Sequence, residues 1–557
     1  MNEQYVREIN GYKIKDEEAI RTYENVSSMK SDTKLTEGMY VKTKGYYNIN
    51  DCGGAEYLIR VKTNSDTEDN GTIHFTQNNL VAELISNEIK VEYFGAKGDG
   101  VTDDTEAFTN AIEYLNDLDE NKRVLYLSNG KNYILTDTLL IKNNFTLTNK
   151  SKLKASITNN TTDIFEIDSE SSLNNRCYNI ELSNIKFVGT NKLISDTTIQ
   201  LWNLVIKNCN ISGFENIFNL PIYATHIYNN VIYNIKSFGT ISGSDNIIEN
   251  NNITGLANSS DRKDSLFILN GLLLTRFLNN FLTGSLESEK GVYNIIKSQS
   301  CKDLTFECNW FDYCDRAGVF INESNFIDII NNTFRGNARI TNGNDDAHIV
   351  LKGSSNVNIN YNSFLNVHIG DQNLTANAYH VFDYSGYIAN NVVIKDNKFQ
   401  IPYYYKINLT NKSLTKGFII EENSVYNYID TNINLLQKYS VDNSNSNGIY
   451  YYQDNHDNVV CSGTSTANTS IYLNGSYGAS TVLFTLRENK TYKAKINDID
   501  SDIQLALFNG STLIKIFSNN EDYTPNEDTE ITAVAIFIQN NKTYYFAKTK
   551  PQLFLIN

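Results

Sequence analysis

Apolar and polar positions alternate along the middle of this chain in a motif that returns at intervals of 21 to 35 residues. In each copy an apolar residue is followed by two variable residues, an asparagine, a variable residue and a second apolar residue. Eight copies place the asparagine at positions from Asn230 to Asn423, and two earlier copies carry Ile185 and Cys209 there. The copies with asparagine read IYNNVI, IENNNI, FLNNFL, FECNWF, IINNTF, INYNSF, IKDNKF and IEENSV.

This motif predicts a parallel β-helix in which every coil contributes one copy. An irregular period in the twenties with strand-like alternation is typical of stacked β coils, and helical repeats do not fit it. Because coils lie about 4.8 Å apart, an asparagine at one bend can hydrogen-bond to its copies in neighbouring coils. Asparagine also tolerates the left-handed backbone of a sharp bend. An asparagine-rich composition alone would scatter this residue, but it would not also place the flanking apolar residues.

The limits of the motif divide the chain into regions. Residues 1–90 lack it and are expected to form a small N-terminal domain, and residues 91–439 are expected to form the β-helix. Residues 440–458 include the polar stretch SVDNSNSNG and are interpreted as a linker. Alternating apolar runs within residues 459–557 predict an antiparallel β-sandwich. The expected fold class is therefore all-β.

A helix is predicted where the β-helix region begins. Asp103 and Glu106 have the spacing of a capping pair at a helix N-terminus. One face of this helix is apolar, formed by Ala107, Phe108, Ala111, Ile112 and Leu115. The first coil of a stack exposes an open apolar end. We therefore expect the helix to cover that end and to take no part in catalysis.

Two segments around this helix resemble a known family. YFGAKGDGVTDDTEAFTNAI, residues 93–112, resembles the opening motif of the pectate-lyase-like superfamily, found in polygalacturonases and in bacteriophage tailspike and appendage proteins. EGMYVKTKGYYNINDCGGAEYLI, residues 37–59, resembles the segment that introduces the β-helix in tail appendage proteins from phages of Gram-positive bacteria. The resemblance implies a right-handed β-helix, a location in the virion with residues 1–90 attached to phage tail proteins, and a homotrimer.

Charge argues against nucleic acid and membranes as partners, and cysteine usage argues against disulfides and a zinc site. Lys and Arg (48) against Asp and Glu (64) give a net charge of −16, which repels phosphate backbones and anionic membranes, so neither nucleic acid nor a membrane is an expected partner. The charged start MNEQYVREINGYKIKDEE leads to the expectation of no secretory signal and of synthesis in the cytoplasm of a bacterial host. Seven cysteines without paired spacing indicate neither a disulfide framework nor a zinc site, and no cofactor is expected.

Chemistry is predicted where histidines and carboxylates gather in the two longest coils. Counting back 14 residues from the motif position aligns Gly318 with His348 on adjacent coils, and His380 heads a similar strand. Counting back 16 residues gives a charged row, with Asp315 and Asp345 beside it, that contains Asp264, Arg316 and Asp346. The candidate catalytic residues are Asp346, Asp345, Asp315 and Asp264. The candidate substrate-binding residues are Arg316, His348, His380, Asp383 and Arg339.

Carboxylates in this row would lie about 5 Å apart on neighbouring coils and about 10 Å apart two coils away. These separations bracket those of retaining and inverting glycosidases. Burial beside a like charge would raise the pKa of one carboxyl, which could then act as a general acid. The row does not determine which two carboxylates would pair.

One coil in this stretch resembles a catalytic coil. NGNDDAHIVLKGSSNVNINYNSF, residues 342–364, resembles the polygalacturonase coil with paired catalytic aspartates, which the resemblance maps onto Asp345 and Asp346. The chain departs from that family because it lacks the Asn-Thr-Asp, Gly-His-Gly and Arg-Ile-Lys segments. Solvated loop side chains are the alternative interpretation. A metal site is less favoured, because no His or Asp pair has ligand spacing on one face, and no Gly-x-Ser-x-Gly turn indicates a serine nucleophile.

The leading hypothesis is a phage tail appendage that binds a host cell-surface glycopolymer, such as teichoic acid, capsule or exopolysaccharide. In its sharper form the protein also cleaves the polymer by hydrolysis or lyase chemistry, and the C-terminal β-sandwich binds carbohydrate or forms trimers. The alternatives are a non-catalytic receptor-binding protein, a bacterial polysaccharide-degrading enzyme and a purely structural spike. The acidic chain suits a neutral or zwitterionic glycan, unless arginines gather locally or a cation bridges it to an anionic one.

Overall fold

A computed structural model of the protein forms two compact units, which are described separately. The first comprises Met1–Asn397 and Lys416–Glu421, and the second comprises Lys398–Thr415 and Glu422–Asn557. For some strands, among them residues 379–383, the backbone alone is described. The structure describes the chain except residues 1–4, 10–11, 16–19, 119–122, 169–173, 256–262, 285–291, 338–346, 366–378, 384–388, 400–406, 410–418, 422–423, 426–432, 435–443, 448, 454–458, 465, 475–479, 481–482, 489, 498–502, 519, 540–542 and 556–557.

The first unit begins with a hairpin and a small mixed sheet. Strands β1 (Tyr5–Ile9) and β2 (Tyr12–Lys15) pair antiparallel. A five-stranded sheet follows in the order β3-β4-β5-β7-β6. Its members are β3 (Arg21–Tyr23), β4 (Tyr40–Thr43), β5 (Glu56–Val61), β6 (Ile73–Phe75) and β7 (Leu80–Leu84). Helix α1 (Val26–Lys30) accompanies this sheet and is capped by Asn25, whose side chain accepts a 2.8 Å hydrogen bond from the Ser28 amide.

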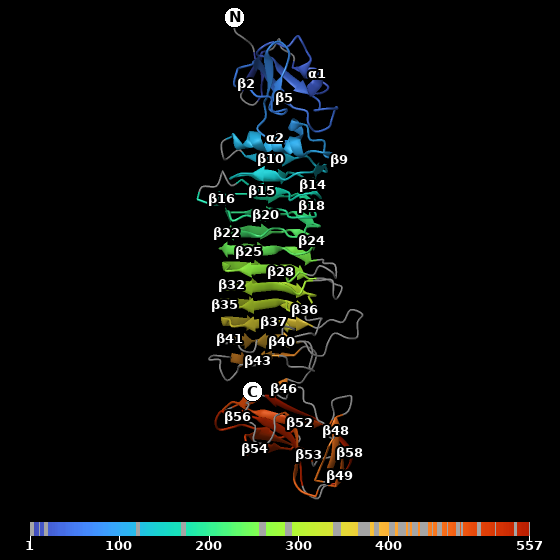
Figure 1. The fold of residues 1–557 in the computed structure, drawn as a ribbon, viewed down its shortest axis with the longest axis vertical. Helices are drawn as coiled ribbons and strands as arrows, with labels where there is room; N and C mark the ends of the chain where they lie inside the picture. Colours follow the sequence, from blue (N-terminus) through green and yellow to red (C-terminus); the bar gives the residue numbers. More distant parts are fainter. Residues whose placement is uncertain are drawn as a thin grey trace. The chain divides into compact units, whose positions relative to one another are not determined.

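The predicted capping helix is α2 (Thr105–Asn116), and its buried face contains the five apolar residues expected from the sequence. It follows β8 (Ile89–Lys90), the 3-10 helix η1 (Val91–Phe94) and β9 (Asp99–Asp103). The Phe108 ring meets the Tyr133 ring of β11 (Asn132–Leu135) edge to face, with centroids 5.3 Å apart. The helix therefore covers the first coil, where Figure 1 also places it.

The predicted capping pair of Asp103 and Glu106 is wrong. Helix α2 starts after Asp104, and no side chain caps its N-terminus. The Asp104 carboxylate instead accepts hydrogen bonds from the backbone of the preceding turn, at 2.7 Å from the Lys97 amide and 3.1 Å from the Gly98 amide. Asp103 accepts a 3.0 Å hydrogen bond from the Thr105 amide. The carboxylates of Asp103 and Asp104 thus bind backbone amides around the start of α2, and Asp103 forms no reciprocal cap with Glu106.

Beyond α2 the chain forms a right-handed parallel β-helix, as predicted, with strands stacked in columns along the coils (Figure 1). We call the columns sheets A, B and C. Sheet A includes β16 (Arg176–Tyr178), β19 (Gln200–Trp202), β22 (Leu220–Tyr223), β25 (Gly239–Ser244), β28 (Ser265–Asn270), β31 (Asn294–Gln299), β34 (Val319–Asn322), β37 (Ala347–Lys352) and β40 (Tyr379–Asp383).

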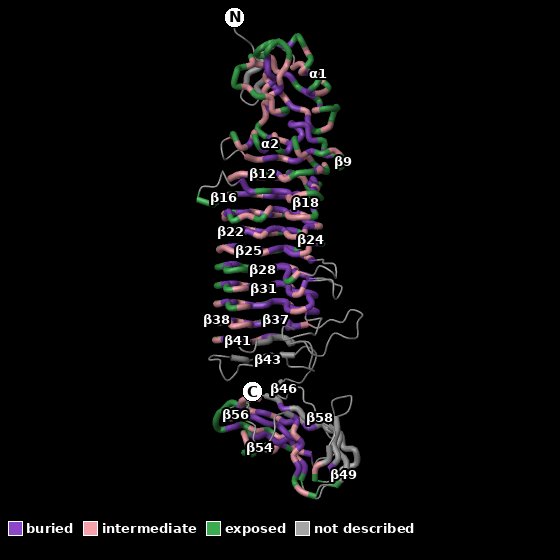
Figure 2. Tube along the Cα trace, in the orientation of Figure 1, coloured by how far each residue is buried: buried purple, intermediate pink, exposed green. Residues whose placement is uncertain are grey.

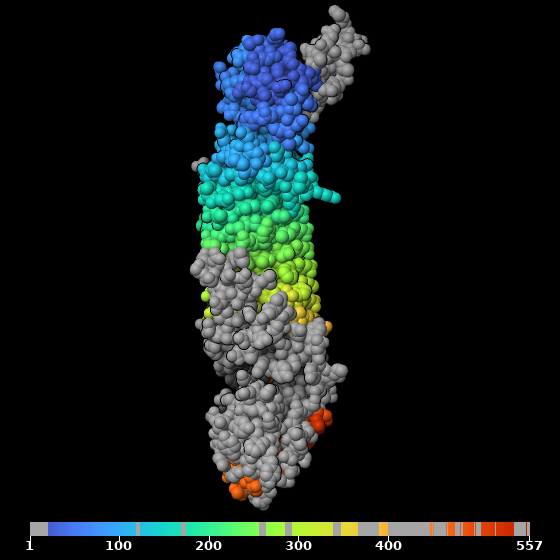
Figure 3. Space-filling model, turned by 90° about the vertical axis from the view of Figure 1, so that its right-hand side faces the viewer, coloured from blue at the N-terminus to red at the C-terminus, as the bar shows by residue number. Residues whose placement is uncertain are grey.

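Sheets B and C complete each coil. Sheet B includes β10 (Val124–Leu127), β13 (Thr146–Asn149), β17 (Glu181–Ser183), β20 (Val205–Lys207), β23 (His226–Tyr228), β26 (Ile247–Glu249), β29 (Leu273–Leu278), β32 (Lys302–Glu307), β35 (Asn325–Ile330), β38 (Ser355–Asn360) and β41 (Asn390–Lys395). Sheet C includes β11, β14 (Ser156–Asn159), β18 (Lys186–Gly189), β21 (Asn210–Ser212), β24 (Val231–Ile235), β27 (Asn252–Gly255), β30 (Phe281–Thr283), β33 (Trp310–Asp312), β36 (Thr333–Arg335) and β39 (Ser363–Leu365). Successive coils appear as bands of colour from cyan to yellow in Figure 3.

The predicted stacking of the motif position is confirmed from Asn230 to Asn397. From Asn230 to Asn362, each side-chain amide donates to the side-chain oxygen of the next asparagine at 2.9 to 3.1 Å. Throughout the series each amide also donates to a backbone carbonyl of the preceding coil at 2.7 to 2.9 Å. All these side chains are buried, so the asparagines form a ladder inside the bend. Cys209 continues the row through its amide, which donates to Asn230 Oδ1 at 2.8 Å, whereas Asn423 lies outside the described residues.

Alternation along each strand sends one set of side chains into the coil interior (Figure 2). In sheet C the rings of Phe311, Phe334 and Phe364 stack coil on coil, with centroid distances of 4.9 and 5.1 Å. The core is thus a set of axial rows, each built from equivalent residues of successive coils.

Two further axial rows have left-handed backbones. The first immediately precedes the ladder position and includes Asn279, Cys308, Asn331 and Tyr361; we call it the bend column. The second lies six residues before the ladder position, has φ between 44° and 60°, and is called the outer column. It comprises Asn179, Asn203, Ala224, Asp245, Leu274, Asp303, Phe326, Asn356 and Asn391. Asparagine and aspartate dominate both columns because they tolerate this conformation.

The second unit contains the predicted antiparallel β-sandwich. One sheet has the order β50-β57-β53-β54, and the other includes β47-β48-β49-β58-β52-β55. Its core includes Leu505, Leu507, Val534, Ile536 and Leu553. Within the range predicted as a linker, β47 and β48 already add strands to the second sheet. The strands are β46 (Ile433–Asn434), β47 (Ser444–Ser446), β48 (Ile449–Gln453), β49 (Val459–Thr464), β50 (Thr469–Asn474), β51 (Phe484–Leu486), β52 (Tyr492–Asn497), β53 (Ile503–Asn509), β54 (Thr512–Phe517), β55 (Asp522–Tyr523), β56 (Thr529–Ile531), β57 (Ala533–Ile538) and β58 (Thr543–Leu555). Across the described parts of both units, no helix is long and apolar enough to cross a membrane.

Candidate functional site

The charged row predicted from the sequence falls at the beginning of the sheet A strands. Strand β34 pairs with β37 so that Val319 is opposite Ile349, which confirms the predicted alignment of Gly318 with His348. Strand β37 pairs in turn with β40, with Ala347 opposite Tyr379, and this register aligns His348 with His380. Sequence spacing therefore predicted the stacking of this edge correctly.

Along this row a carboxylate, a phenol and a guanidinium occupy three successive coils. Asp264 is exposed, and its carboxylate lies 2.5 Å from Nζ of Lys297 in β31. Tyr293 occupies the position of the row after Asp264, on the next coil. The Arg316 amide donates a 2.7 Å hydrogen bond to the Tyr293 carbonyl. The Arg316 guanidinium lies 4.9 Å from the centre of the Tyr293 ring. Among the described members of the row, acidic side chains therefore do not occupy neighbouring coils.

Asp315 differs from Asp264 in its surroundings. Asp315 is fully buried, whereas about half of the Asp264 side chain is exposed. The two residues are separated by two coil steps, or about 10 Å along the stack. Their carboxylates do not face a common solvent-filled space, so the structure does not bring these two predicted catalytic residues together.

His348 is a core residue in this structure. Only 2% of it is exposed, and its ring lies 5.9 Å from the Phe334 ring and 5.6 Å from the Phe364 ring. The Asn337 side-chain nitrogen is 3.2 Å from Nδ1 of the imidazole. The predicted contact of His348 with substrate would require the ring to leave this core.

The remaining predicted site residues are less fully described. Asp345, Asp346 and Arg339 lie outside the described residues. His380 and Asp383 belong to β40, of which the backbone alone is described. Their roles remain predictions.

Sheet C carries a charged pair that was not predicted from the sequence. The Arg335 guanidinium in β36 donates two hydrogen bonds to the buried Asp312 carboxylate in β33, one of them 2.7 Å long from Nε. The same guanidinium lies 5.3 Å from the centre of the Trp310 ring and 5.0 Å from that of Tyr313. Hydrogen bonding to Asp312 raises the pKa of Arg335 further above its usual value. Spacing in the sequence could have predicted this pair, because Asp312 and Arg335 each lie three positions after a ladder asparagine, Asn309 and Asn332 respectively.

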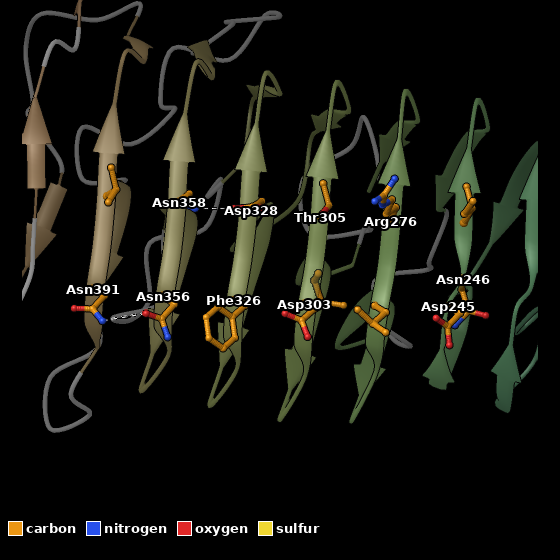
Figure 4. A pocket seen from close by; sticks show the side chains of 14 residues that line it. Asp245, Asn246, Arg276, Asp303, Thr305, Phe326, Asp328, Asn356, Asn358 and Asn391 are labelled. Atoms are coloured by element: carbon orange, nitrogen blue, oxygen red, sulfur yellow. Dashed lines mark hydrogen bonds between the residues drawn. The ribbon is translucent and has the colours of Figure 1, made fainter.

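The outer face of sheet B carries a groove of about 760 Å³ (Figure 4). It crosses β26, β29, β32, β35, β38 and β41. One row of lining residues belongs to the outer column, and a second row points outward from the strands. The second row follows the pairing register and reads Ile247, Arg276, Thr305, Asp328, Asn358 and Val393. Both rows could have been found in the sequence from their constant spacing. The outer column lies six residues before the ladder position, and the second row lies four residues before it.

The groove has more negative than positive charge. Its carboxylates are Asp245, Asp303 and Asp328, and its lining has one cation, Arg276. Asp328 accepts a 2.7 Å hydrogen bond from Asn358, and Asp245 accepts one of 2.6 Å from Ser244. No cluster of three or more potential metal-ligating side chains occurs in the part of the chain that the structure describes.

Comparison with protein families and known proteins places the β-helix among related folds. A family model described as rhamnogalacturonase A/epimerase, pectate lyase-like, matches residues 88–272. This match covers about a third of the chain and includes the predicted opening motif. No curated protein matches the sequence.

Two solved phage structures have a similar fold. Tailspike protein 2 of the Escherichia coli O157:H7 bacteriophage CAB120 aligns over 96% of this chain and 83% of its own, with 14% identity and a TM-score of 0.56. The gp42 tailspike of Acinetobacter phage vb_AbaP_AS12 aligns over 90% of this chain and 94% of its own, with 12% identity and a TM-score of 0.54. At these identities the likeness concerns the fold, so the β-helix of this chain is one that phage tailspikes also use.

Proposed function

We infer that this protein is a bacteriophage tail appendage that binds a glycopolymer on the surface of its host. The observation that carries this proposal is the repetition of outward side chains from coil to coil, at a rise of about 4.8 Å. A polysaccharide repeats its rings and hydroxyl groups at intervals of comparable length, whereas a small ligand does not. The two fold relatives named above are tailspikes, which supports a role in the virion.

The proposal assigns a role to each region. Residues 1–90 attach the protein to phage tail proteins, and the β-helix and the C-terminal β-sandwich contact the polymer. Three copies associate, the host is a Gram-positive bacterium, and the protein is made in its cytoplasm. The resemblance of residues 37–59 and 93–112 to phage appendage proteins supports the trimer and the class of host. Teichoic acid, capsule and exopolysaccharide are the candidate polymers. With a net charge of −16, the chain favours a neutral or zwitterionic one.

Purified virions and purified protein provide the test. We expect the protein among the virion proteins identified by mass spectrometry, and we expect the full chain to retain glycopolymer extracted from the host wall. Absence from virions together with activity on exported polysaccharide would instead favour a bacterial enzyme. Presence in virions without glycan binding would favour a purely structural spike.

Cleavage of the polymer is a second candidate, favoured by the exposed carboxylate of Asp264 at the edge of sheet A. Incubating the full chain with host polymer and following product size by gel filtration tests this activity. Asp264→Asn, Asp315→Asn and Asp346→Asn variants test the assignment of the residues. Products that appear at unchanged rates with all three variants would contradict that assignment, and binding without products would identify a non-catalytic receptor-binding protein.

A further inference from the structure

The sheet B groove departs from the asparagine pattern that organises the rest of the β-helix. At three positions of the outer column, Ala224, Leu274 and Phe326 replace the usual asparagine or aspartate, and the two bulky residues, Leu274 and Phe326, line the groove. Both keep the left-handed backbone, with φ of 44° and 58°. Bulky side chains are sterically disfavoured in this conformation, so these residues are more strained than asparagine would be there.

Neither residue is buried. Leu274 is 55% exposed and Phe326 is 48% exposed, and both line the groove. Lys302 approaches the Phe326 ring, with Nζ 5.6 Å from the ring centre, but half of the aromatic residue stays accessible. Strained residues whose apolar surface faces solvent are more readily explained by a ligand than by stability.

Strain alone does not identify a site, as Tyr361 shows. Tyr361 has φ of 59° in the bend column and is 58% exposed, but it does not line the groove. Leu274 and Phe326 differ because they occupy one hollow with polar side chains from neighbouring coils (Figure 4). A hollow, an accessible ring and aligned polar groups thus occur together on sheet B.

The polar groups of the groove are held in place by one another. Asn391 donates a 3.0 Å hydrogen bond to Asn356, which donates one of 2.7 Å to Asn325. Such chains fix the amides while leaving lone pairs and N–H groups for a ligand. Among the described residues, no acidic side chain lies within ion-pair distance of Arg276. Arg276 is exposed and lines the groove, so its guanidinium can donate hydrogen bonds to a ligand there.

Resting on the proposed function, we propose that the sheet B groove is the binding site for the glycopolymer. The chain of sugars lies along the coil axis, and the Phe326 ring packs against the apolar face of one sugar. The asparagine amides donate to and accept from sugar hydroxyl groups, and the carboxylates accept from them. From β26 to β41 the five coil steps of about 4.8 Å span about 24 Å, so the groove holds several sugars of one chain. The three carboxylates still outnumber Arg276 and the neighbouring Lys302, whose Nζ lies 3.9 Å from Asp303, and this balance favours a polymer without a repeating negative charge.

Substitution to the consensus residue of the column gives a test that does not depend on destabilising the protein. Phe326→Asn and Leu274→Asn each replace a strained apolar residue by the residue that the column favours, so both variants are expected to unfold at the same or a higher temperature than the wild type. Phe326→Asn is expected to weaken glycopolymer binding by about tenfold or more, because it removes the apolar packing surface. Tyr361→Asn is the matched control, with the same change of conformational strain outside the groove and no expected loss of binding.

The probes are the neutral polysaccharide fraction and the anionic teichoic acid fraction of the host wall, tested against the full chain by biolayer interferometry. We expect binding of the neutral fraction that persists in about 0.5 M NaCl, where exposed charge pairs are screened. Binding confined to the anionic fraction, and lost in salt, would overturn the assignment of polymer class. Binding that is equally tight for the wild type and Phe326→Asn would overturn the site but leave the proposed function intact. Wild-type protein that binds neither fraction would contradict the proposed function itself.

The groove could instead be a surface where copies of the chain meet, and sedimentation velocity distinguishes the two. We expect the wild type and Phe326→Asn to have the same oligomeric state. A dissociated Phe326→Asn variant would assign the groove to an interface between subunits and overturn its assignment to a glycan.

Discussion

Asn251 Nδ2 and Asn251 N both donate to the same side-chain oxygen of Asn280, at 3.0 and 3.1 Å. The Asn251 oxygen in turn accepts from the amide and the side chain of Asn230, each at 3.0 Å. The buried Asn251 carboxamide therefore satisfies two backbone groups of the preceding coil, the Asn230 amide and the Ile227 carbonyl, and also bonds the Asn280 side chain of the next coil. Such groups in the interior have no access to water.

Asn251→Ala is expected to destabilise the β-helix by about 3 kcal/mol, because it leaves several buried hydrogen-bonding groups without a partner. Denaturant unfolding followed by fluorescence measures the effect. The neighbouring Asn252 is exposed on β27, so Asn252→Ala is the control, with an expected change of about 0.5 kcal/mol or less. Equal effects of the two substitutions would show that the ladder contributes no specific stability.

Arg335→Ala is expected to lower stability by about 3 kcal/mol, because it leaves the buried Asp312 carboxylate without its guanidinium partner. The exposed ion pair of Lys150 with Glu88 provides the comparison, and Lys150→Ala is expected to change the stability far less, because solvent screens exposed ion pairs. Thermal unfolding of both variants measures the difference. A change in Arg335→Ala as small as that in Lys150→Ala would mean that water readily reaches Asp312.

His74 is expected to make the N-terminal domain sensitive to acid. Burial lowers the pKa of His74 to about 4, and its ring lies 5.4 Å from the Tyr57 ring. The unfolded chain, with an ordinary pKa of about 6.5, therefore binds more protons between these two values. Stability is complete above pH 6.5 and falls by about 3 kcal/mol as the pH decreases to 4.

Hydrogen exchange at the amides of Tyr57 and Ile59, recorded between pH 4 and 7 and corrected for the intrinsic rate, measures this sensitivity. His74→Phe keeps a ring of similar size without a titrating group, and it should remove the pH dependence. Protection that is independent of pH in the wild type would contradict the neutral, buried state of His74.

Thiol reactivity is expected to separate the exposed from the buried cysteines. Cys52 and Cys308 are exposed, whereas Cys177 and Cys209 are buried, which raises the pKa of Cys177 to about 12 and that of Cys209 to about 11. Iodoacetamide at pH 8 should label the exposed pair in the native protein and reach the buried pair only in denaturant. Peptide mapping by mass spectrometry reads out each site. Rapid native labelling of Cys209 would show that the coil near the start of the ladder opens.

Much of the fold was predictable because each coil repeats the same short motif with the same local structure. The motif predicted the ladder from Asn230 to Asn397, and counting back from it predicted the pairing of β34 with β37. Stacking makes a constant sequence offset equivalent to a position in space, so register follows from spacing alone.

The site was less predictable because strand alternation does not apply to Asp315, which lies in the bend before β34, and does not separate inside from outside in β37, where five successive residues including His348 are buried. Asp315 and His348 were expected near a substrate, but both are buried. Residues of the groove were missed because Leu274 and Phe326 do not look functional in a strand pattern. Their unusual character becomes visible only when the left-handed backbone of the outer column is known.

The pairing of Asn252 with Phe281 on adjacent coils has an evolutionary consequence. Excising the 29 residues from Asn252 to Asn280 would join Asn251 directly to Phe281, and would keep an asparagine beside the next one at Asn309. Genes for such a chain can thus lengthen or shorten it by whole turns through duplication or loss. The outward surface of the β-helix can then change in length while the cap at α2 is inherited unaltered.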